Sequence, residues 1–264
     1  MMSRYSYIYM NIFRNTRRRC CMPAAMRTER NFMESPIVSV NGLTKEYNGM
    51  PALKNVNLSL PRGRVIGLLG PNGSGKTTFI KLLVGLLKPT AGIVMIDGYP
   101  VGIRTKEVVS YLPERNSLPL YMTAEQLIRY FADFFPDFCE ERCRHMLADL
   151  GLPMDKPIRN YSKGMREKVQ LIMVMSRNAK LYILDEPIAG VDPASRDYII
   201  DTIIKNRDPL STVLISTHLI ADIEKALQEF VFIRQGEIVV YDAVQNVHEA
   251  GKTVDALFRE VFKW

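Results

Sequence analysis

A glycine-rich loop between a short apolar segment and a helical segment constrains the fold of this 264-residue chain more than any other feature. The loop, Gly70-Pro71-Asn72-Gly73-Ser74-Gly75-Lys76-Thr77, matches the pattern G-x-x-x-x-G-K-[ST]. Between a buried strand and a helix, such a loop directs backbone N–H groups and the positive end of the helix dipole at phosphate oxygens. The sequence therefore predicts a phosphate-binding site at the start of a helix.

Side chains of this loop add chemistry that its backbone lacks. Lys76 is predicted to reach the β- and γ-phosphates of a nucleotide, and the Thr77 hydroxyl to ligate Mg²⁺. The alternative, a glycine loop without a ligand, is disfavoured by the strand and the helix that flank it. The loop residues expected to contact the nucleotide are Asn72, Gly73, Ser74, Gly75, Lys76, Thr77 and Thr78.

A second apolar segment, residues 181–184, is followed directly by two carboxylates, Asp185 and Glu186. A buried strand can end in two acids by accident, so the pair gains its meaning from the phosphate loop. Asp185 is predicted to hold the metal, directly or through water. Glu186 is predicted to polarise the attacking water, a role worth about 10²–10⁴ in rate.

Strand-like and helix-like segments alternate on either side of a mainly helical stretch at residues 121–180. This alternation predicts an α/β fold with a mainly parallel sheet. We expect one domain over residues 35–245, with a helical subdomain inserted at about 115–178. Residues 246–264 are expected to form an amphipathic helix that packs on the chain's own core or on a partner. Its apolar face consists of Val254, Leu257, Phe258, Val261 and Phe262.

The net charge of +7 lies almost entirely at the N-terminus. Residues 1–32 contain seven arginines and one glutamate, which leaves a net charge of only +1 for the rest. A nearly neutral body argues against a nucleic-acid-binding surface. We expect residues 1–34 to be a basic, disordered extension; a true start at Met33 and attraction to anionic lipid are the alternatives. No apolar run is long enough to span a bilayer.

From about residue 36 to 245, the ordered set of motifs resembles the ATP-binding subunits of ABC (ATP-binding cassette) transporters. Residues 161–165, Tyr-Ser-Lys-Gly-Met, stand where that family has its Leu-Ser-Gly-Gly-Gln signature. Asp192 corresponds to the loop that crosses the dimer interface, and His218 to the switch histidine. Tyr47 stands at the aromatic residue that stacks on adenine, and Glu114 stands where the family usually has glutamine.

The resemblance implies a P-loop NTPase core with a mainly parallel sheet, an N-terminal antiparallel β lobe and an inserted α-helical subdomain. It implies ATP and Mg²⁺ as cofactors. Catalysis is then assigned to Lys76, Glu186 and His218. Beyond the phosphate loop, the nucleotide is expected to contact Tyr47, Ser162, Gly164 and Asp192. The metal is expected at Thr77, Asp185 and Glu114. Lys163 and Met165 depart from the family's signature.

The resemblance also implies what the chain does. It is expected to hydrolyse ATP to ADP and phosphate and to power transport through a separate polytopic membrane subunit, as in ABC-2-type exporters. It is expected to pair with a second cassette, identical or different, and to lie in the cytoplasm on the inner face of the cell membrane. The alternative is a nucleic-acid- or ribosome-associated ATPase of the same family. A single cassette without Cys-x-x-Cys pairs or sustained heptads disfavours it.

Overall fold

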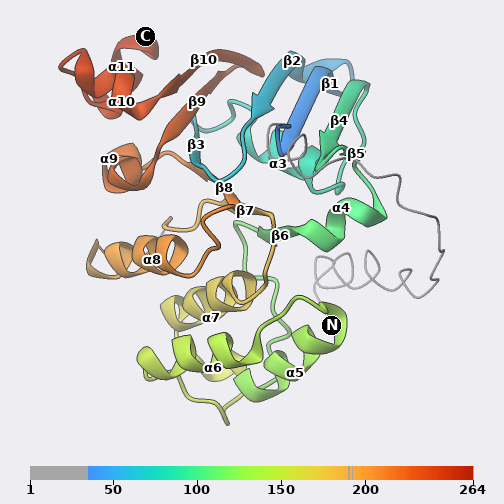
Figure 1. Cartoon of the computed structure of the whole chain (residues 1–264), viewed down its shortest axis with the longest axis vertical. Coiled ribbons are helices and arrows are strands. Elements are labelled where there is room, and N and C mark those ends of the chain that lie inside the picture. The colour runs from blue at the N-terminus through green and yellow to red at the C-terminus, as the bar shows by residue number, and fades with distance from the viewer. Residues whose placement is uncertain (1–34, 190, 192, 264) are drawn as a thin grey trace. The chain divides into compact units, whose positions relative to one another are not determined.

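The computed structural model describes residues 35–189, 191 and 193–263 (Figure 1). The predictions made for residues 1–34 and for Asp192 lie outside these residues. The described chain folds as two compact units. One is the helical stretch Arg115–Asn178, and the other combines Ser35–Glu114 with the chain from Ala179 onward.

The N-terminal part of the larger unit is a four-stranded sheet in the order β2-β1-β4-β5, with every neighbouring pair antiparallel (Figure 1). Apolar and polar residues alternate over Val56–Leu60 of β2, where the apolar side chains are buried and the residues between them are exposed. The sheet confirms the predicted antiparallel β lobe. Its strands are β1 (Val38–Tyr47), β2 (Met50–Leu60), β4 (Ala91–Ile96) and β5 (Tyr99–Pro100).

The second sheet of this unit has six strands in the order β10-β9-β3-β8-β7-β6. All neighbours are parallel except β10 and β9, which are antiparallel. The strands are β3 (Val65–Leu69), β6 (Val109–Leu112), β7 (Leu181–Asp185), β8 (Thr212–Thr217), β9 (Glu229–Arg234) and β10 (Glu237–Ala243). The central strands β3, β7 and β8 are buried along their whole length, which explains their continuous apolar sequences.

The order of these strands positions the site. Strand β8 lies between β3 and β7, and the register pairs Leu69 with Thr217 and Asp185 with Ser216. The carboxyl ends of three parallel strands therefore meet at one edge of the sheet. Ligands bind at this edge in open α/β sheets.

Helices complete the larger unit: α3 (Lys76–Leu83), α4 (Ile103–Val108), α8 (Pro193–Lys205), α9 (Ile220–Ile223), the 3₁₀ turn η2 (Glu224–Ala226), α10 (Val244–Glu249) and α11 (Val254–Val261). The single amphipathic helix expected at 246–264 is thus two short helices. Gly251 ends α10 in a left-handed conformation (φ +74°), and the Lys252 N–H donates to the Val247 carbonyl. This Schellman motif stops the first helix.

The apolar face of α11 packs on the chain's own sheet. Phe258 and Phe262 lie edge-on against Phe232 of β9, with ring centroids 5.4 and 5.7 Å away. Val254 is fully buried. Of the two alternatives left open by the sequence, the structure therefore shows packing on the core.

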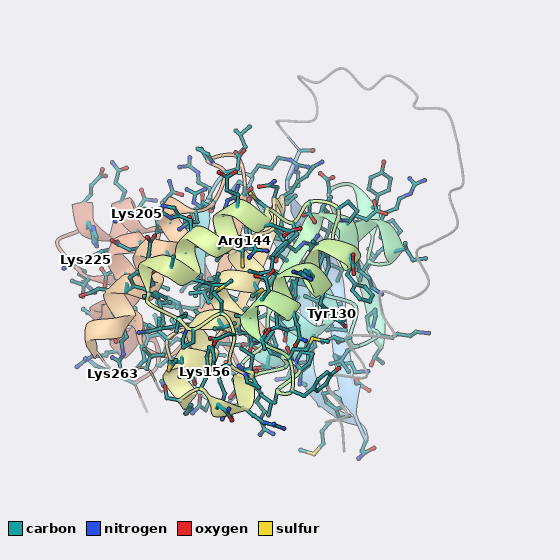
Figure 2. The ribbon with its side chains drawn as sticks, turned by 90° about the horizontal axis from the view of Figure 1, so that it is seen from below. Tyr130, Arg144, Lys156, Lys205, Lys225 and Lys263 are labelled. Atoms are coloured by element: carbon teal, nitrogen blue, oxygen red, sulfur yellow. The ribbon has the colours of Figure 1, made fainter. Side chains whose placement is uncertain are left out.

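The smaller unit consists of α5 (Ala124–Phe134), α6 (Glu140–Asp149), the 3₁₀ turn η1 (Ile158–Asn160) and α7 (Lys163–Met175). Thr123 and Gln126 form a capping box at the start of α5. Tyr130 of α5 packs on Phe134, and Arg144 of α6 donates hydrogen bonds to Glu125 of α5. Figure 2 labels Tyr130 and Arg144. Among the described residues, no helix is both long and apolar enough to cross a membrane.

Candidate active site

The phosphate loop joins β3 to α3, as the sequence predicts. Gly75 occupies the N-cap of α3 with φ +111°, and a Cβ at this position would lie 2.8 Å from the Ala52 carbonyl oxygen. At Gly70, a Cβ would lie 2.4 Å from the Ile233 carbonyl oxygen. The loop is therefore held between β2 and β9, and both positions require glycine.

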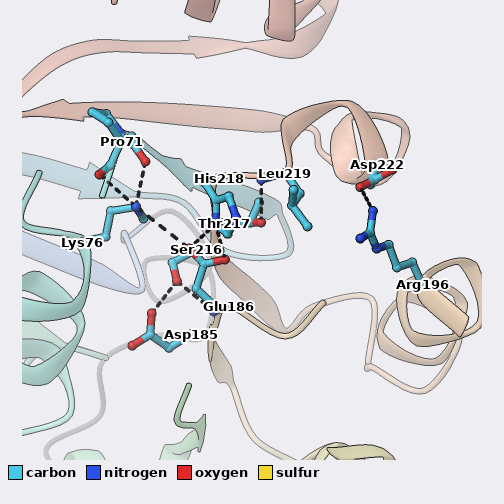
Figure 3. A network of polar contacts seen from close by, with 11 residues as sticks. Pro71, Lys76, Asp185, Glu186, Arg196, Ser216, Thr217, His218, Leu219 and Asp222 are labelled. Atoms are coloured by element: carbon cyan, nitrogen blue, oxygen red, sulfur yellow. Dashed lines mark hydrogen bonds and ion pairs between the residues drawn. The ribbon is translucent and has the colours of Figure 1, made fainter. Parts of the chain in front are cut away.

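Lys76 is almost completely buried, with 6% of its surface exposed. Its Nζ donates to the carbonyl oxygens of Gly70 (2.7 Å) and Pro71 (3.2 Å), and lies 4.0 Å from Oε1 of Glu186 (Figure 3). Burial lowers the pKa of Lys76 from its usual value, and the attraction of nearby carboxylates, first that of Glu186, opposes this. The ammonium group is thus held inside the loop by weak acceptors that a phosphate can replace.

Asp185, at the carboxyl end of β7, is 1% exposed. The Ser216 hydroxyl donates to Oδ1 of Asp185 over 2.5 Å. Burial raises the pKa of Asp185, and the negative charges of Glu114 and Glu186 act in the same direction, whereas the hydroxyl groups of Ser216 and Thr77 oppose it. Ionising the Asp185 carboxylate therefore costs free energy in this environment, and a cation bound beside it would lower that cost.

Two buried oxygen atoms at this edge lack partners. Oδ2 of Asp185 and Oγ of Ser74 have no hydrogen-bond partner among the residues that the structure describes. Buried polar atoms are usually satisfied, so orphaned ones indicate a missing ligand. A carboxylate oxygen beside the Thr77 hydroxyl fits Mg²⁺, which prefers oxygen ligands and takes one or two carboxylates with substrate phosphates. Within the described residues, no cluster of three or more acidic, histidine or cysteine side chains suggests a self-sufficient metal site.

Glu186 has an unusual backbone for a residue with a large side chain. Its φ is +53°, in the left-handed region, which costs of order 1–3 kcal/mol. Its N–H donates to both the carbonyl oxygen (3.0 Å) and the hydroxyl oxygen (3.1 Å) of Ser216. Both carboxylate oxygens lie 3.1 Å from Nδ1 of His218 (Figure 3). The strained turn thus places the carboxylate between His218 and Lys76.

Arg196 of α8 connects the segment after β7 to α9. Its Nη1 pairs with Oδ2 of Asp222 at 2.6 Å (Figure 3). Its Nε donates to the Val191 carbonyl over 3.1 Å. Sequence reasoning missed both Arg196 and Ser216. Only the short distance of Ser216 from His218 along the chain signals its place, because its contact with Asp185 depends on strand order.

Two further predicted site residues lie at the ends of strands in the larger unit. Tyr47 ends β1 with 44% of its surface exposed, and Nζ of Lys45 lies 5.3 Å from the ring centroid. Glu114 follows β6 and is exposed, yet its charge acts on both Lys76 and Asp185. An open aromatic ring and an exposed carboxylate are both available to a ligand.

The remaining predicted residues belong to the smaller unit. Ser162 is the N-cap of α7, where its hydroxyl accepts from the Met165 N–H over 3.2 Å. Lys163 is directed to Glu167, one turn along α7, at 3.8 Å. A Cβ at Gly164 would meet no atom of the described chain within 4 Å. The glycine is thus not required by packing inside this chain. The structure brings together Lys76, Thr77, Asp185, Glu186 and His218, and Ser162 and Gly164 are in the other unit.

Fold and site together define a nucleotide hydrolase of the P-loop class. The sequence pattern of the ABC transporter family matches residues 53–189. The uncharacterised ABC transporter ATP-binding protein YdbJ of Bacillus subtilis is 33% identical over 223 residues, which cover 82% of this chain and 72% of YdbJ. The lantibiotic transport ATP-binding protein SrtF of Streptococcus pyogenes is 29% identical, over 81% of this chain and 95% of SrtF.

Solved structures agree. An ATP-binding subunit of an ABC transporter superposes with a TM-score of 0.78 at 27% identity, over 86% of this chain and 100% of that chain. CbiO1 of Clostridium perfringens, part of the ABC transporter complex CbiONQ, superposes with a TM-score of 0.70 at 26% identity, over 86% and 95%. The chain belongs to the ABC transporter family as an ATP-binding subunit, an ATPase that powers transport. This confirms the family predicted from the motifs.

Proposed function

We propose that this chain hydrolyses MgATP at a site shared between two cassettes and thereby drives export through a separate membrane subunit. The observation that carries the proposal is the cluster at the carboxyl edge of the parallel sheet. There Lys76, Glu186 and His218 form one contact network beside the partnerless oxygen of Asp185. Each group has the chemistry that one part of ATP hydrolysis needs.

Lys76 binds the β- and γ-phosphates after leaving the carbonyl oxygens of Gly70 and Pro71. Phosphate oxygens are stronger acceptors because they are charged. The backbone N–H groups of the loop and the N-terminus of α3 bind the same phosphates. The Ser74 hydroxyl, buried without a partner, donates to a phosphate oxygen. These residues bind and orient the nucleotide.

Thr77 and Asp185 hold Mg²⁺, with Glu114 as a further ligand or as a charge close to it. When bound, Mg²⁺ neutralises charge on the phosphate oxygens. Asp185 contributes Oδ2, because Oδ1 is already bonded to Ser216. The charge of the ion also offsets the cost of ionising a buried carboxylate, which burial otherwise imposes on Asp185.

Glu186 orients the attacking water and accepts its proton, and His218 holds the Glu186 carboxylate in place through Nδ1. Tyr47 provides a half-exposed ring on which adenine stacks. These roles follow the family resemblance, and the geometry of the larger unit supports them.

The second half of the site comes from another cassette. Ser162, Gly164 and Asp192 are assigned to contact the nucleotide bound by the partner, whether identical or different. Two facts support this for the smaller unit. The N-terminus of α7 carries a partial positive charge, and none of the residues that the structure describes lies within 4 Å of a Cβ placed at Gly164. The γ-phosphate of a nucleotide held by the partner cassette would be stabilised by these groups, which the partner's own phosphate loop does not supply.

The membrane partner is proposed from likeness. CbiO1 works in a named complex, CbiONQ, and SrtF is named for lantibiotic transport. By analogy this chain lies at the inner face of the cell membrane and serves a separate permease. When the chain is produced together with its permease, it should remain on washed membranes. Recovery of the same fraction without the permease would contradict this part of the proposal.

Mixing two inactive variants tests the shared site. Lys76→Ala removes the phosphate contact, and Ser162→Arg blocks the signature. In a mixed dimer, one site carries both changes and the other carries neither. Random pairing of equal amounts should therefore restore about a quarter of the wild-type ATPase rate. Lys76→Ala mixed with the separate control Lys76→Ala/Ser162→Arg should restore nothing. Absence of rescue, together with concentration-independent wild-type activity, would refute the shared site.

A further inference from the structure

One serine contacts both of the consecutive carboxylate residues of the site. Ser216 lies on β8, is completely buried, and is paired in register with Asp185 of β7. Its hydroxyl donates to Oδ1 of Asp185, and the hydroxyl oxygen accepts the N–H of Glu186 (Figure 3). Nothing in the sequence patterns assigned a role to Ser216.

The direction of these hydrogen bonds is fixed by chemistry. A serine hydroxyl has one hydrogen, and two lone pairs that accept. A carboxylate only accepts, and a backbone N–H only donates, so the hydrogen is directed at Asp185 and a lone pair at Glu186. The hydroxyl therefore cannot rotate without losing both bonds.

Two consequences follow for the carboxylates. Because Oδ1 of Asp185 is occupied by the Ser216 hydroxyl, Oδ2 is the oxygen left without a partner in the described part of the chain. Because the Glu186 N–H is held by the hydroxyl and the carbonyl of Ser216, the left-handed turn of Glu186 is supported at the point where it is strained. One side chain sets the orientation of one carboxylate and the backbone of the next.

We propose that Ser216 is a positioning residue that presents Oδ2 of Asp185 to Mg²⁺ and keeps the Glu186 backbone in its left-handed conformation. This inference rests on the proposed role of Asp185 in holding the metal. Ser216 itself contacts neither the nucleotide nor the ion. Loss of such a partner from a metal ligand typically weakens metal binding about 10–100-fold.

The chain offers a matched control. Ser211, before β8, is also buried, and its hydroxyl donates to the Ala179 carbonyl over 2.6 Å. Ser211→Ala and Ser216→Ala each remove one buried hydroxyl, from neighbouring positions along the chain, and only the second change touches the carboxylates. A general loss of stability should therefore affect both variants, whereas a change in metal response should appear in one.

The experiment measures binding of a fluorescent ATP analogue to the full chain at increasing Mg²⁺ and, separately, with a chelator. In Ser216→Ala, the Mg²⁺ concentration that gives half of the metal-dependent gain in affinity should rise about 10-fold or more. Binding with the chelator should equal that of the wild type. Ser211→Ala should match the wild type in both. The proposed support of the Glu186 backbone is tested by ATPase turnover at saturating Mg²⁺. Turnover should fall in Ser216→Ala but not in Ser211→Ala.

Further variants separate the possible failures. In an Asp185→Asn background, Ser216→Ala should cause no further shift in Mg²⁺ response. If Ser216→Ala does not fold, Ser216→Cys keeps a weak donor in the same place and should show a smaller shift in the same direction. An unchanged Mg²⁺ response and turnover in the folded Ser216 variant would overturn the proposal for Ser216. If Asp185→Asn itself leaves the Mg²⁺ response intact, the assignment of Asp185 fails instead.

Discussion

Asp185 and Glu224, two buried carboxylates of the larger unit, have opposite hydrogen-bonding environments. Asp185 accepts a hydroxyl at Oδ1, Oδ2 has no partner among the described residues, and burial raises its pKa. For Glu224 of η2, burial also acts to raise the pKa, but hydrogen bonds from His248 and from the N–H groups of Val254 and Asp255 outweigh it, and the net pKa is lowered. One carboxylate is left in need of a cation, and the other is satisfied.

The groups around Asp185 and Glu224 differ in the same way as the two carboxylates do: those around Asp185 are strained or buried with a charge, and those around Glu224 are satisfied. Around Asp185 lie a buried ammonium group at Lys76 and a strained backbone at Glu186. Around Glu224, Oε1 accepts the Val254 N–H at the first turn of α11, and Thr253 caps the same helix. The comparison teaches that the carboxylate with a partnerless oxygen lies at the site, whereas the satisfied one joins η2 to α10 and α11.

The largest expected effect comes from Glu186→Gln. The amide keeps the size of the side chain but cannot accept the proton of water, so steady-state ATP hydrolysis should fall about 10²-fold or more. ATP binding should persist, and an ATP-bound dimer should accumulate on size-exclusion chromatography. Thermal stability should not decrease, because the strained backbone is unchanged. Turnover within twofold of the wild type would remove Glu186 from catalysis.

Tyr47→Ala should have the next largest effect, on binding alone. Loss of a stacking ring costs about 1–3 kcal/mol per base, which corresponds to roughly a 5- to 150-fold weaker ATP affinity. Turnover at saturating ATP should be preserved, and Tyr47→Phe should behave as the wild type. The affinity is measured by fluorescence titration. Equal affinities of the Ala and Phe variants would show that adenine does not stack on this ring.

Glu224→Gln should change stability and leave catalysis intact. Replacing the charged acceptor weakens three hydrogen bonds, and the expected loss is about 1–2 kcal/mol in the free energy of unfolding. ATP affinity and turnover should match the wild type. Glu249→Gln, on the exposed face of α10, is the matched control and should not change the melting temperature. Impaired turnover in folded Glu224→Gln would show that Glu224 also affects catalysis, contrary to the contrast drawn between Glu224 and Asp185.

The smallest expected effect is the pH dependence of the difference in unfolding free energy between the wild type and Glu224→Gln. A carboxylate with a lowered pKa in the folded state adds stability above its unfolded value of 4.5, and loses it as the pH falls through the folded value. The stability gap between wild type and Glu224→Gln should therefore be full near neutral pH and close below pH 4.5. Urea unfolding across this range measures it. A gap that is constant with pH would show that the charge of Glu224 is not involved.

Much of the site was predictable because its signals are local. The phosphate loop requires glycines and a lysine at fixed spacing, and a strand ending in Asp185 and Glu186 is visible as an apolar segment followed by two acids. The alternation of strands and helices also indicated the parallel sheet. The same local patterns led to one wrong expectation. The apolar periodicity over residues 254–262 correctly indicated α11, but the single helix expected from residue 246 onward is divided by the left-handed Gly251.

The sequence by itself therefore determined which residues are candidates for the chemistry, because residue type and spacing within one segment decide what a loop or strand end is able to bind. Only the tertiary structure decided how those segments meet. The contact between Ser216 and Asp185 spans 31 positions along the chain and exists because β8 pairs with β7 in one register. The opposite pKa shifts of Asp185 and Glu224 likewise depend on which groups the fold packs around each carboxylate. Strand order and burial arise from long-range packing, which no short pattern contains.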